Sequence, residues 1–125
     1  MRYWIESEDL WSANERGVVW HGRPDGHSAL SVLLLPGTED AVVLLHWGSG
    51  PRNPLGDLKG WPNLVRVRPD GTVAWRANAG RISGDQDWWV SVDIEAGNVY
   101  ASTWSCYRRR VDRESGTVLS SVFTK

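Results

Sequence analysis

Two acidic residues beside a tryptophan are the first candidates for chemistry in this sequence. Asp85 and Asp87 are two residues apart, so in an extended chain their side chains point the same way, next to Trp88. A carboxyl group in an apolar setting can have its pKa raised while a nearby carboxylate stays ionised, as glycosidases require. Because two acids in a polar connector also form solvated turns, a hydrolase is the third of three interpretations, and no catalytic residue is assigned.

Other signs of catalysis or cofactor binding are weak. The three histidines, His21, His27 and His46, share no metal-ligand spacing, and the single Cys106 adds none. No Gly-x-Ser-x-Gly elbow and no Gly-Lys-Ser/Thr phosphate loop occurs. We therefore expect no metal and no cofactor, and the sequence leans away from an enzyme. His46 lies in an apolar segment and is expected to be a hydrogen-bonded core residue, and Cys106 a half-buried strand residue.

Tryptophan is the unusual component of the composition. Nine of the 13 aromatic residues are tryptophan, at positions 4, 11, 20, 47, 61, 75, 88, 89 and 104. Trp75 and Trp88 share their predicted strand faces with valines, which favours a place in the core. Trp89 shares its face with Ser91 and Asp93, which favours exposure. An exposed tryptophan beside polar groups can stack on a sugar ring or anchor a protein partner.

The long irregular segment 48 to 62 is the first place to look for a binding site. It holds four glycines and three prolines among 15 residues, a composition that cannot maintain a strand ladder. Ordered loops of this length in compact domains are often functional, although a tolerated insertion between two strands is the alternative. The predicted binding residues are Trp61, Trp89, Asp87, His46, Trp47 and Arg52.

Charge and composition exclude some partners. The chain has 125 residues, 14 basic and 15 acidic, with a net charge of −1, so no overall field would attract nucleic acid or an anionic membrane. The first nine residues become acidic where a signal peptide needs an apolar run, and no segment has the roughly 18 apolar residues of a membrane-spanning helix. We expect a cytoplasmic protein that binds neither nucleic acid nor membrane.

The elements that must position these residues are β-strands. In segment 63 to 77, Pro69, Asp70 and Gly71 form a turn between two short strands, because proline presets φ and glycine permits a positive φ. The predicted strands cover residues 2 to 6, 17 to 21, 28 to 35, 41 to 47, 63 to 68, 72 to 77, 88 to 94, 99 to 104, 107 to 112 and 117 to 124. Segment 7 to 16 is predicted to be a loop.

The predicted strands form a repeat. Two four-stranded antiparallel units, at residues 27 to 77 and 86 to 125, follow a half unit at residues 1 to 26, in which strands 2 to 6 and 17 to 21 pair. Together they form one β domain of residues 1 to 125. Gly71 and Gly116 are 45 residues apart, and a period of 40 to 50 residues with four short strands each is typical of propeller blades.

The hairpins also resemble the repeat of quinoprotein-like propellers, in which an aspartate, a Thr-Gly turn and a tryptophan four residues after the glycine recur. Gly71 and Trp75 match part of that pattern, whereas position 68 is arginine where aspartate is expected. The second copy keeps Asp112, Ser115 and Gly116 but has Ser120 in place of the tryptophan. The resemblance implies blade topology over about 95 residues and no particular cofactor. Segment 87 to 125 also resembles short uncharacterised bacterial proteins.

Two and a half blades cannot surround a channel, since propellers close with about four to eight. The all-β chain is therefore expected to fold as a compact sandwich or open barrel, or to associate with other copies through its edges. The basic run at residues 108 to 110 alternates between the two faces of a strand and fits either an anion site or a solvated edge. The leading hypothesis is a non-enzymatic protein-interaction or structural module, with a small-molecule or carbohydrate binder second.

Overall fold

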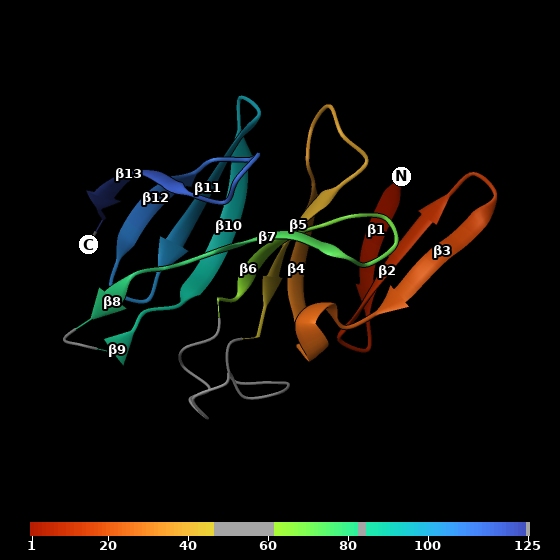
Figure 1. The fold of residues 1–125 in the computed structure, drawn as a ribbon, viewed down its shortest axis with the longest axis horizontal. Helices are drawn as coiled ribbons and strands as arrows, with labels where there is room; N and C mark the ends of the chain where they lie inside the picture. The colour runs from red at the N-terminus through yellow and green to blue at the C-terminus, as the bar shows by residue number, and fades with distance from the viewer. Residues whose placement is uncertain (47–61, 83–84, 125) are drawn as a thin grey trace.

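The computed structural model describes residues 1–46, 62–82 and 85–124, and these residues are almost entirely β-structure (Figure 1). One short 3-10 helix, η1 (Pro24–Gly26), interrupts the strands. The strands are β1 (Arg2–Glu6), β2 (Asp9–Asn14), β3 (Gly17–Gly22), β4 (Ala29–Leu34), β5 (Ala41–Leu45), β6 (Leu64–Val67), β7 (Val73–Ala77), β8 (Arg81–Ile82), β9 (Asp85–Gln86), β10 (Trp89–Glu95), β11 (Asn98–Thr103), β12 (Tyr107–Val111) and β13 (Val118–Phe123).

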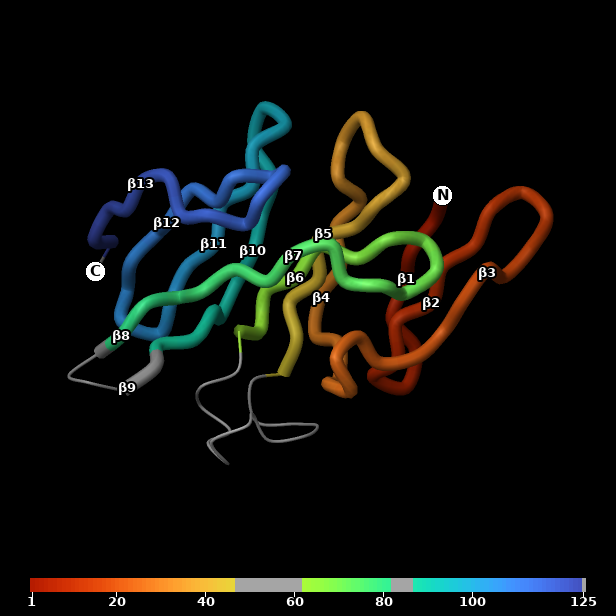
Figure 2. The backbone as a smooth tube through the Cα atoms, in the orientation of Figure 1, coloured from red at the N-terminus to blue at the C-terminus, as the bar shows by residue number. Residues whose placement is uncertain are grey.

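Three antiparallel sheets follow one another along the chain. The first sheet has the order β1-β2-β3, the middle sheet β4-β5-β6-β7 and the third sheet β10-β11-β12-β13, while β8 and β9 form a separate two-stranded ribbon. Each strand pairs with its neighbour in sequence, as in propeller blades. Figure 1 shows the middle sheet between the other two, and the termini lie on opposite sides of the molecule (Figure 2). The described sheets do not close into a barrel.

The last hairpin of every sheet is built in the same way. In each of the three, the strand register shifts by one residue shortly after the turn, which marks a β-bulge. The paired residues on the two sides of the bulge are Ala13↔Val18 and Ser12↔Trp20 in the first sheet, Val67↔Val73 and Arg66↔Trp75 in the middle sheet, and Val111↔Val118 and Arg110↔Ser120 in the third sheet. The three sheets can therefore be compared residue by residue.

Two apolar clusters join the sheets. The first lies between the first and middle sheets and contains Leu10, Val43 and Val65, with Trp20 packed against it. The second lies between the middle and third sheets and contains residues such as Trp75 and Val99. Since burying a large apolar side chain contributes about 1.5–3 kcal/mol, these two clusters fix the order of the sheets.

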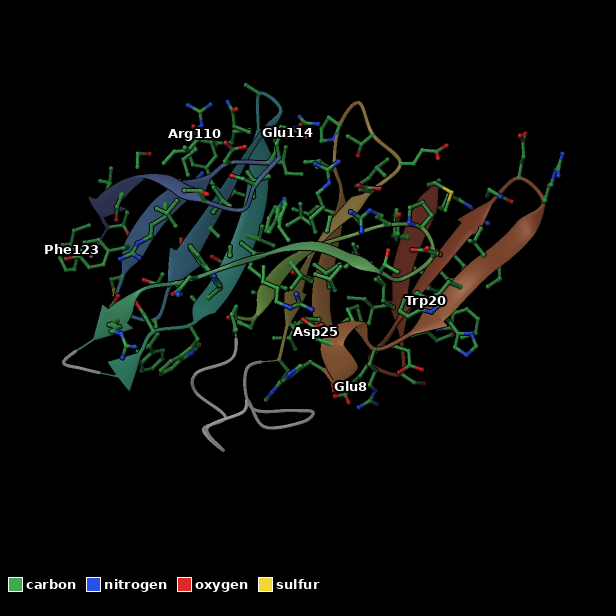
Figure 3. The ribbon with its side chains drawn as sticks, in the orientation of Figure 1. Glu8, Trp20, Asp25, Arg110, Glu114 and Phe123 are labelled. Atoms are coloured by element: carbon green, nitrogen blue, oxygen red, sulfur yellow. The ribbon has the colours of Figure 1, made fainter. Side chains whose placement is uncertain are left out.

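A tryptophan of one sheet packs on a glycine of the next at both boundaries. A Cβ atom built on Gly71 would lie 2.2 Å from the Trp20 ring, and one built on Gly116 would lie 2.7 Å from the Trp75 ring. Figure 3 shows Trp20 reaching from β3 toward the β6–β7 turn. Both glycines have positive φ values, +87° and +79°. Only glycine gives the turn its shape and leaves room for an indole ring.

The strand predictions were confirmed for most of the chain, with two corrections near the N-terminus. Segment 7 to 16 is not a loop, because β2 lies there and pairs with both β1 and β3. Strands 2 to 6 and 17 to 21 therefore do not pair with each other, and the half unit is a three-stranded sheet. The mixed polar and apolar composition of this segment hid an alternation in which Leu10 and Ser12 face the middle sheet.

Two smaller corrections concern turns and connectors. Cys106 is exposed and has φ of +71° in the turn between β11 and β12, so it is not a half-buried strand residue. The polar connector after β7 contains the short strands β8 and β9. Within the described ranges, no helix is long and apolar enough to cross a membrane.

Candidate functional site

The three predicted binding residues that the structure describes, His46, Asp87 and Trp89, do not form an exposed site. Trp61, Trp47 and Arg52 lie outside the described residues. His46 is exposed rather than part of the core, because β5 ends at Leu45. The backbone N–H of His46 donates to the Ser28 carbonyl at 2.8 Å. The remaining two, Trp89 and Asp87, are both buried.

Trp89 was expected to be exposed, and this prediction was wrong. The residue is 1 % exposed and lies in the cluster between the middle and third sheets. A bulge between Trp89 and Ser91 inserts one extra residue, so Trp89 faces the core together with Val92 instead of sharing a face with Ser91. Its indole Nε1 donates to the Ala77 carbonyl at 2.9 Å. Trp89 therefore joins two sheets and cannot stack on a ligand.

Asp87 is 1 % exposed and serves a turn rather than a reaction. Its Oδ1 accepts the backbone N–H of Trp88 at 2.9 Å, and its Oδ2 accepts the Ser105 hydroxyl. The Ser105 hydroxyl in turn lies 3.0 Å from that of Thr103. These partners occupy both carboxylate oxygens, so Asp87 holds the chain in place ahead of β10. Asp85 lies in β9, and its side chain is outside the described residues.

The tryptophan that Asp87 positions is part of an exposed aromatic pair. Trp88, expected in the core, is half-buried, and its ring stacks on Trp104 with centroids 5.4 Å apart and planes at 15°. The side chain of Trp104 is 62 % exposed. Trp75, by contrast, lies in the core as predicted, at 6 % exposure, with its Nε1 donating to the Arg113 carbonyl at 2.7 Å.

A larger aromatic surface lies on the outer face of the first sheet. The ring of Trp11 stacks on that of Trp4, with centroids 5.9 Å apart, and on that of His21, with centroids 4.2 Å apart. The guanidinium of Arg2 lies 5.6 Å from the centroid of Trp4. Since these residues are opposite one another on adjacent strands, they form a continuous ladder across the sheet.

This ladder belongs to a sheet face that no other described sheet covers. Its residues point away from the apolar cluster that joins the first and middle sheets. We call this surface the N-terminal open face; it consists of Arg2, Trp4, Glu6, Asp9, Trp11, Ala13, Val18 and His21. The indole Nε1 of Trp11 is buried and has no hydrogen-bond partner among the described residues. Beside the ladder, a cavity of about 380 Å³ is lined by Met1, Arg2, Ala13, Asn14, Glu15 and Gly17.

The opposite end of the molecule has a different surface. The outer face of the third sheet, here called the C-terminal open face, consists of Ser91, Asp93, Glu95, Asn98, Tyr100, Ser102, Arg108, Arg110, Ser120 and the exposed Val122. Arg108 donates to both oxygens of Asp93 at 2.8 and 2.9 Å and lies over the ring of Tyr100. This pairing with Asp93 raises the pKa of Arg108. Arg109 points to the other face, where it donates to the Ala79 carbonyl, as its predicted alternation requires.

Sequence reasoning missed the N-terminal open face because it placed no strand in segment 7 to 16. The signal that could have found it is the pair Trp4 and Trp11 on either side of a short acidic turn, followed by His21. Once β2 is recognised as the partner of both neighbours, cross-strand pairing brings these three rings onto one face. No group of three or more potential metal ligands is present in the parts of the chain that the structure describes.

Comparison with known proteins supports the fold and leaves the activity open. Residues 38–123 match the model of a family described as "Domain of unknown function (DUF7957)". No curated protein matches the sequence significantly. The crystal structure of BamB from Moraxella catarrhalis is similar in fold, with a TM-score of 0.59 and 13% sequence identity, over 98% of this chain and 32% of that chain.

The likeness to BamB is one of fold alone, since so low an identity carries no function. It agrees with the propeller-like arrangement of the three sheets, and the chain spans about one third of the length of that protein. A closer relation to quinoprotein-like propellers stays a prediction.

Proposed function

We propose a function from geometry, because this chain belongs to the family described as "Domain of unknown function (DUF7957)" and that description names no activity. The proposed function is a non-enzymatic module that binds another protein. The observation that carries this proposal is the N-terminal open face, where Trp4, Trp11 and His21 stack in a ladder on an uncovered sheet. Tryptophan is enriched among the residues that dominate protein interfaces, because it combines a large apolar area with few rotatable bonds.

The surroundings of the ladder fit a protein interface. Val18 is 56 % exposed on the same sheet face, and Arg2, Glu6 and Asp9 surround the rings with charge. An apolar centre with a polar rim is the usual anatomy of a binding surface.

The polar groups that could support catalysis have structural partners instead. Asp87 is occupied by Ser105 and the Trp88 backbone, and Asp93 by Arg108. Arg66 is bound to Asp40 at 2.8 Å. A general acid or base must be able to reach a substrate, and these carboxylates are already engaged. Their arrangement supports a binding role over a hydrolytic one.

The proposal is tested by immobilising the protein and comparing what it retains from an extract of the cells that make it. We expect Trp4→Ser to lose proteins that the wild type retains, because it removes one of the two tryptophan rings of the ladder. Tyr100→Ser is the matched control, since it removes an aromatic side chain from the C-terminal open face. Identical sets of retained proteins from all three would contradict the proposal.

A carbohydrate-binding role is the second candidate, supported by the Trp88–Trp104 pair. The side chain of Trp104 is 62 % exposed while one ring face rests on Trp88, which leaves a flat platform of the kind that sugar rings stack on. Tryptophan fluorescence titration with neutral polysaccharides, using Trp104→Ala as the control, tests this role. Quenching that is identical in the wild type and the variant would exclude this platform.

A further inference from the structure

The contact between a tryptophan and the next sheet occurs twice in this molecule and is missing a third time. Trp20 of the first sheet packs on Gly71 in the last turn of the middle sheet, and Trp75 of the middle sheet packs on Gly116 in the last turn of the third sheet. The first sheet has a last turn of its own, between β2 and β3, but no tryptophan among the described residues packs on Gly17 in this turn. We propose that the cavity at this turn binds the indole ring of a tryptophan on a β-strand of a partner protein.

Register places the cavity at the equivalent position. Ala13 occupies the place in the first sheet that Val67 and Val111 occupy in the other two, next to the bulge of the last hairpin. Val67 and Val111 are buried core residues that face the preceding sheet. Ala13 points toward the N-terminal open face, is itself only 1 % exposed, and lies at the edge of the cavity of about 380 Å³. The site therefore continues an interface that already exists twice within the chain.

The lining of the cavity suits an indole. A Cβ atom built on Gly17 would have no heavy atom within 4 Å, so the space above this turn is open, whereas that above Gly71 and Gly116 is filled by a ring. Arg2 borders the cavity and can lie against an aromatic face. Asn14 and Glu15 supply oxygen atoms for an indole N–H, as the Arg113 carbonyl does for Trp75.

A second copy of this chain is not the partner that fits best. The residue equivalent to Trp20 and Trp75 in the third sheet is Ser120, which pairs with Arg110 just as Trp75 pairs with Arg66. The C-terminal open face thus has no indole to offer at the position that would meet the next sheet. We therefore assign the occupant to a sheet or hairpin of a different protein that presents a tryptophan. This inference rests on the proposed function and names the partner's chemistry.

The binding test uses N-acetyl-tryptophanamide as the probe and amide chemical shifts of the full chain as the readout. We expect saturable shifts at Ala13 and Gly17, and binding at least about tenfold weaker for N-acetyl-leucinamide. Ala13→Leu fills the cavity and should weaken binding about tenfold. Arg2→Ala, an exposed substitution that keeps the fold, should weaken it about threefold. Ser102→Leu on the C-terminal open face is the matched control and should change nothing.

A second experiment asks whether the chain can be made to fill its own cavity. Ser120→Trp restores the missing tryptophan, so copies should associate head to tail, as measured by light scattering at increasing protein concentration. Adding Ala13→Leu to this variant should abolish the association, and Ser102→Trp, which places the ring elsewhere on the same face, should stay monomeric.

The outcomes separate this inference from the proposed function. Absence of saturable tryptophanamide binding overturns the inference, and so does binding that Ala13→Leu and Arg2→Ala leave unchanged. A monomeric Ser120→Trp chain contradicts the equivalence of the three sheets and overturns it as well. If the wild type still retains proteins that Trp4→Ser loses, the proposed function stands and only the indole site is lost.

Discussion

The two open faces of the molecule differ in the interactions that their side chains make. On the C-terminal open face, Arg108 binds Asp93 through two hydrogen bonds and covers Tyr100, and Arg110 donates to Asn98 at 3.0 Å. On the N-terminal open face, Trp4 and its neighbours stack on one another beside an open cavity. The C-terminal open face is organised around paired charges, with exposed apolar side chains such as Val122 beside them, whereas the N-terminal open face is organised around stacked, half-buried rings.

This difference has a physical meaning for a row of stacked units. The middle sheet has both faces covered, whereas the first and third sheets each have one face that no other described sheet covers, and repeat proteins give such outer faces a polar surface. The paired charges of the third sheet follow that rule, and the aromatic ladder of the first sheet departs from it. We infer that a binding partner adds to the aromatic face of the first sheet rather than to the charge-paired face of the third sheet.

The contrast between the two open faces requires that the opposite face of the first and third sheets packs in the core. The substitution with the largest expected effect on stability tests this requirement. Trp89→Ala removes a buried ring between the middle and third sheets together with its hydrogen bond to Ala77. We expect a loss of about 3–5 kcal/mol in the free energy of unfolding, measured by urea denaturation. A loss below 1 kcal/mol would show that the third sheet is not held by this cluster.

The next effect concerns binding on the N-terminal open face. Trp11→Ala removes the middle ring of the ladder, which contacts both Trp4 and His21. We expect about 2 kcal/mol, or roughly 30-fold, weaker binding to any protein retained by the wild type, as for an interface hot spot. The same substitution should lower the free energy of unfolding by a smaller amount, about 1 kcal/mol. Unchanged affinity in a surface-binding assay would remove the ladder from the interface.

Tyr3 lies on the same strand as Trp4 but packs against the core, so its substitution should change folding stability and leave binding unchanged. Its hydroxyl donates to the Glu39 carbonyl at 2.5 Å, and burial, followed by the nearby Asp40, raises its pKa well above the usual range. In the unfolded chain the group ionises near pH 10, so folding stability is complete below that pH and falls as the pH rises above it.

Tyr3→Phe should therefore cost about 1 kcal/mol at neutral pH and weaken the decline above pH 10. Urea denaturation at neutral and alkaline pH measures both quantities, and the retention of partner proteins should not change. An alkaline decline equal to that of the wild type would exclude Tyr3 as its source.

The smallest effect is expected on the C-terminal open face. Asp93→Asn breaks the two-bond contact with Arg108, but both side chains are substantially exposed, at 44% and 32%. Exposed ion pairs of this kind contribute about 0.2–1 kcal/mol, and salt screens them. Thermal unfolding at low and high salt should show a small difference that disappears with salt, with no change in binding. A change in partner retention would refute the contrast between the two faces.

The sequence predicted the middle and third sheets well, for reasons that are local. Turn residues such as Asp70 and Gly71 define a hairpin within a few positions, and the apolar runs of β4 and β5 have the length of strands. The positions of Gly71 and Gly116 gave the repeat, and Trp75 lies in the core as its pattern indicated.

The candidate site could not be predicted in the same way, because bulges decide which face a residue occupies. One extra residue after Trp89 moved this ring from the surface into the core. Another bulge, next to Ala13, set the face of Trp20. A shift of one residue reverses the two faces of a strand, and alternation alone does not reveal it. Predicting the aromatic ladder also required β2 to be recognised as a strand.

The most direct test places a photoreactive benzoylphenylalanine on each open face in the cells that make the protein, at position 21 in one variant and at position 102 in the other. We predict a specific cross-linked protein adduct from position 21, lost when Trp4→Ser is added, and no such adduct from position 102. Adducts of equal yield from both positions, or from position 102 alone, would contradict the assignment of binding to the first sheet.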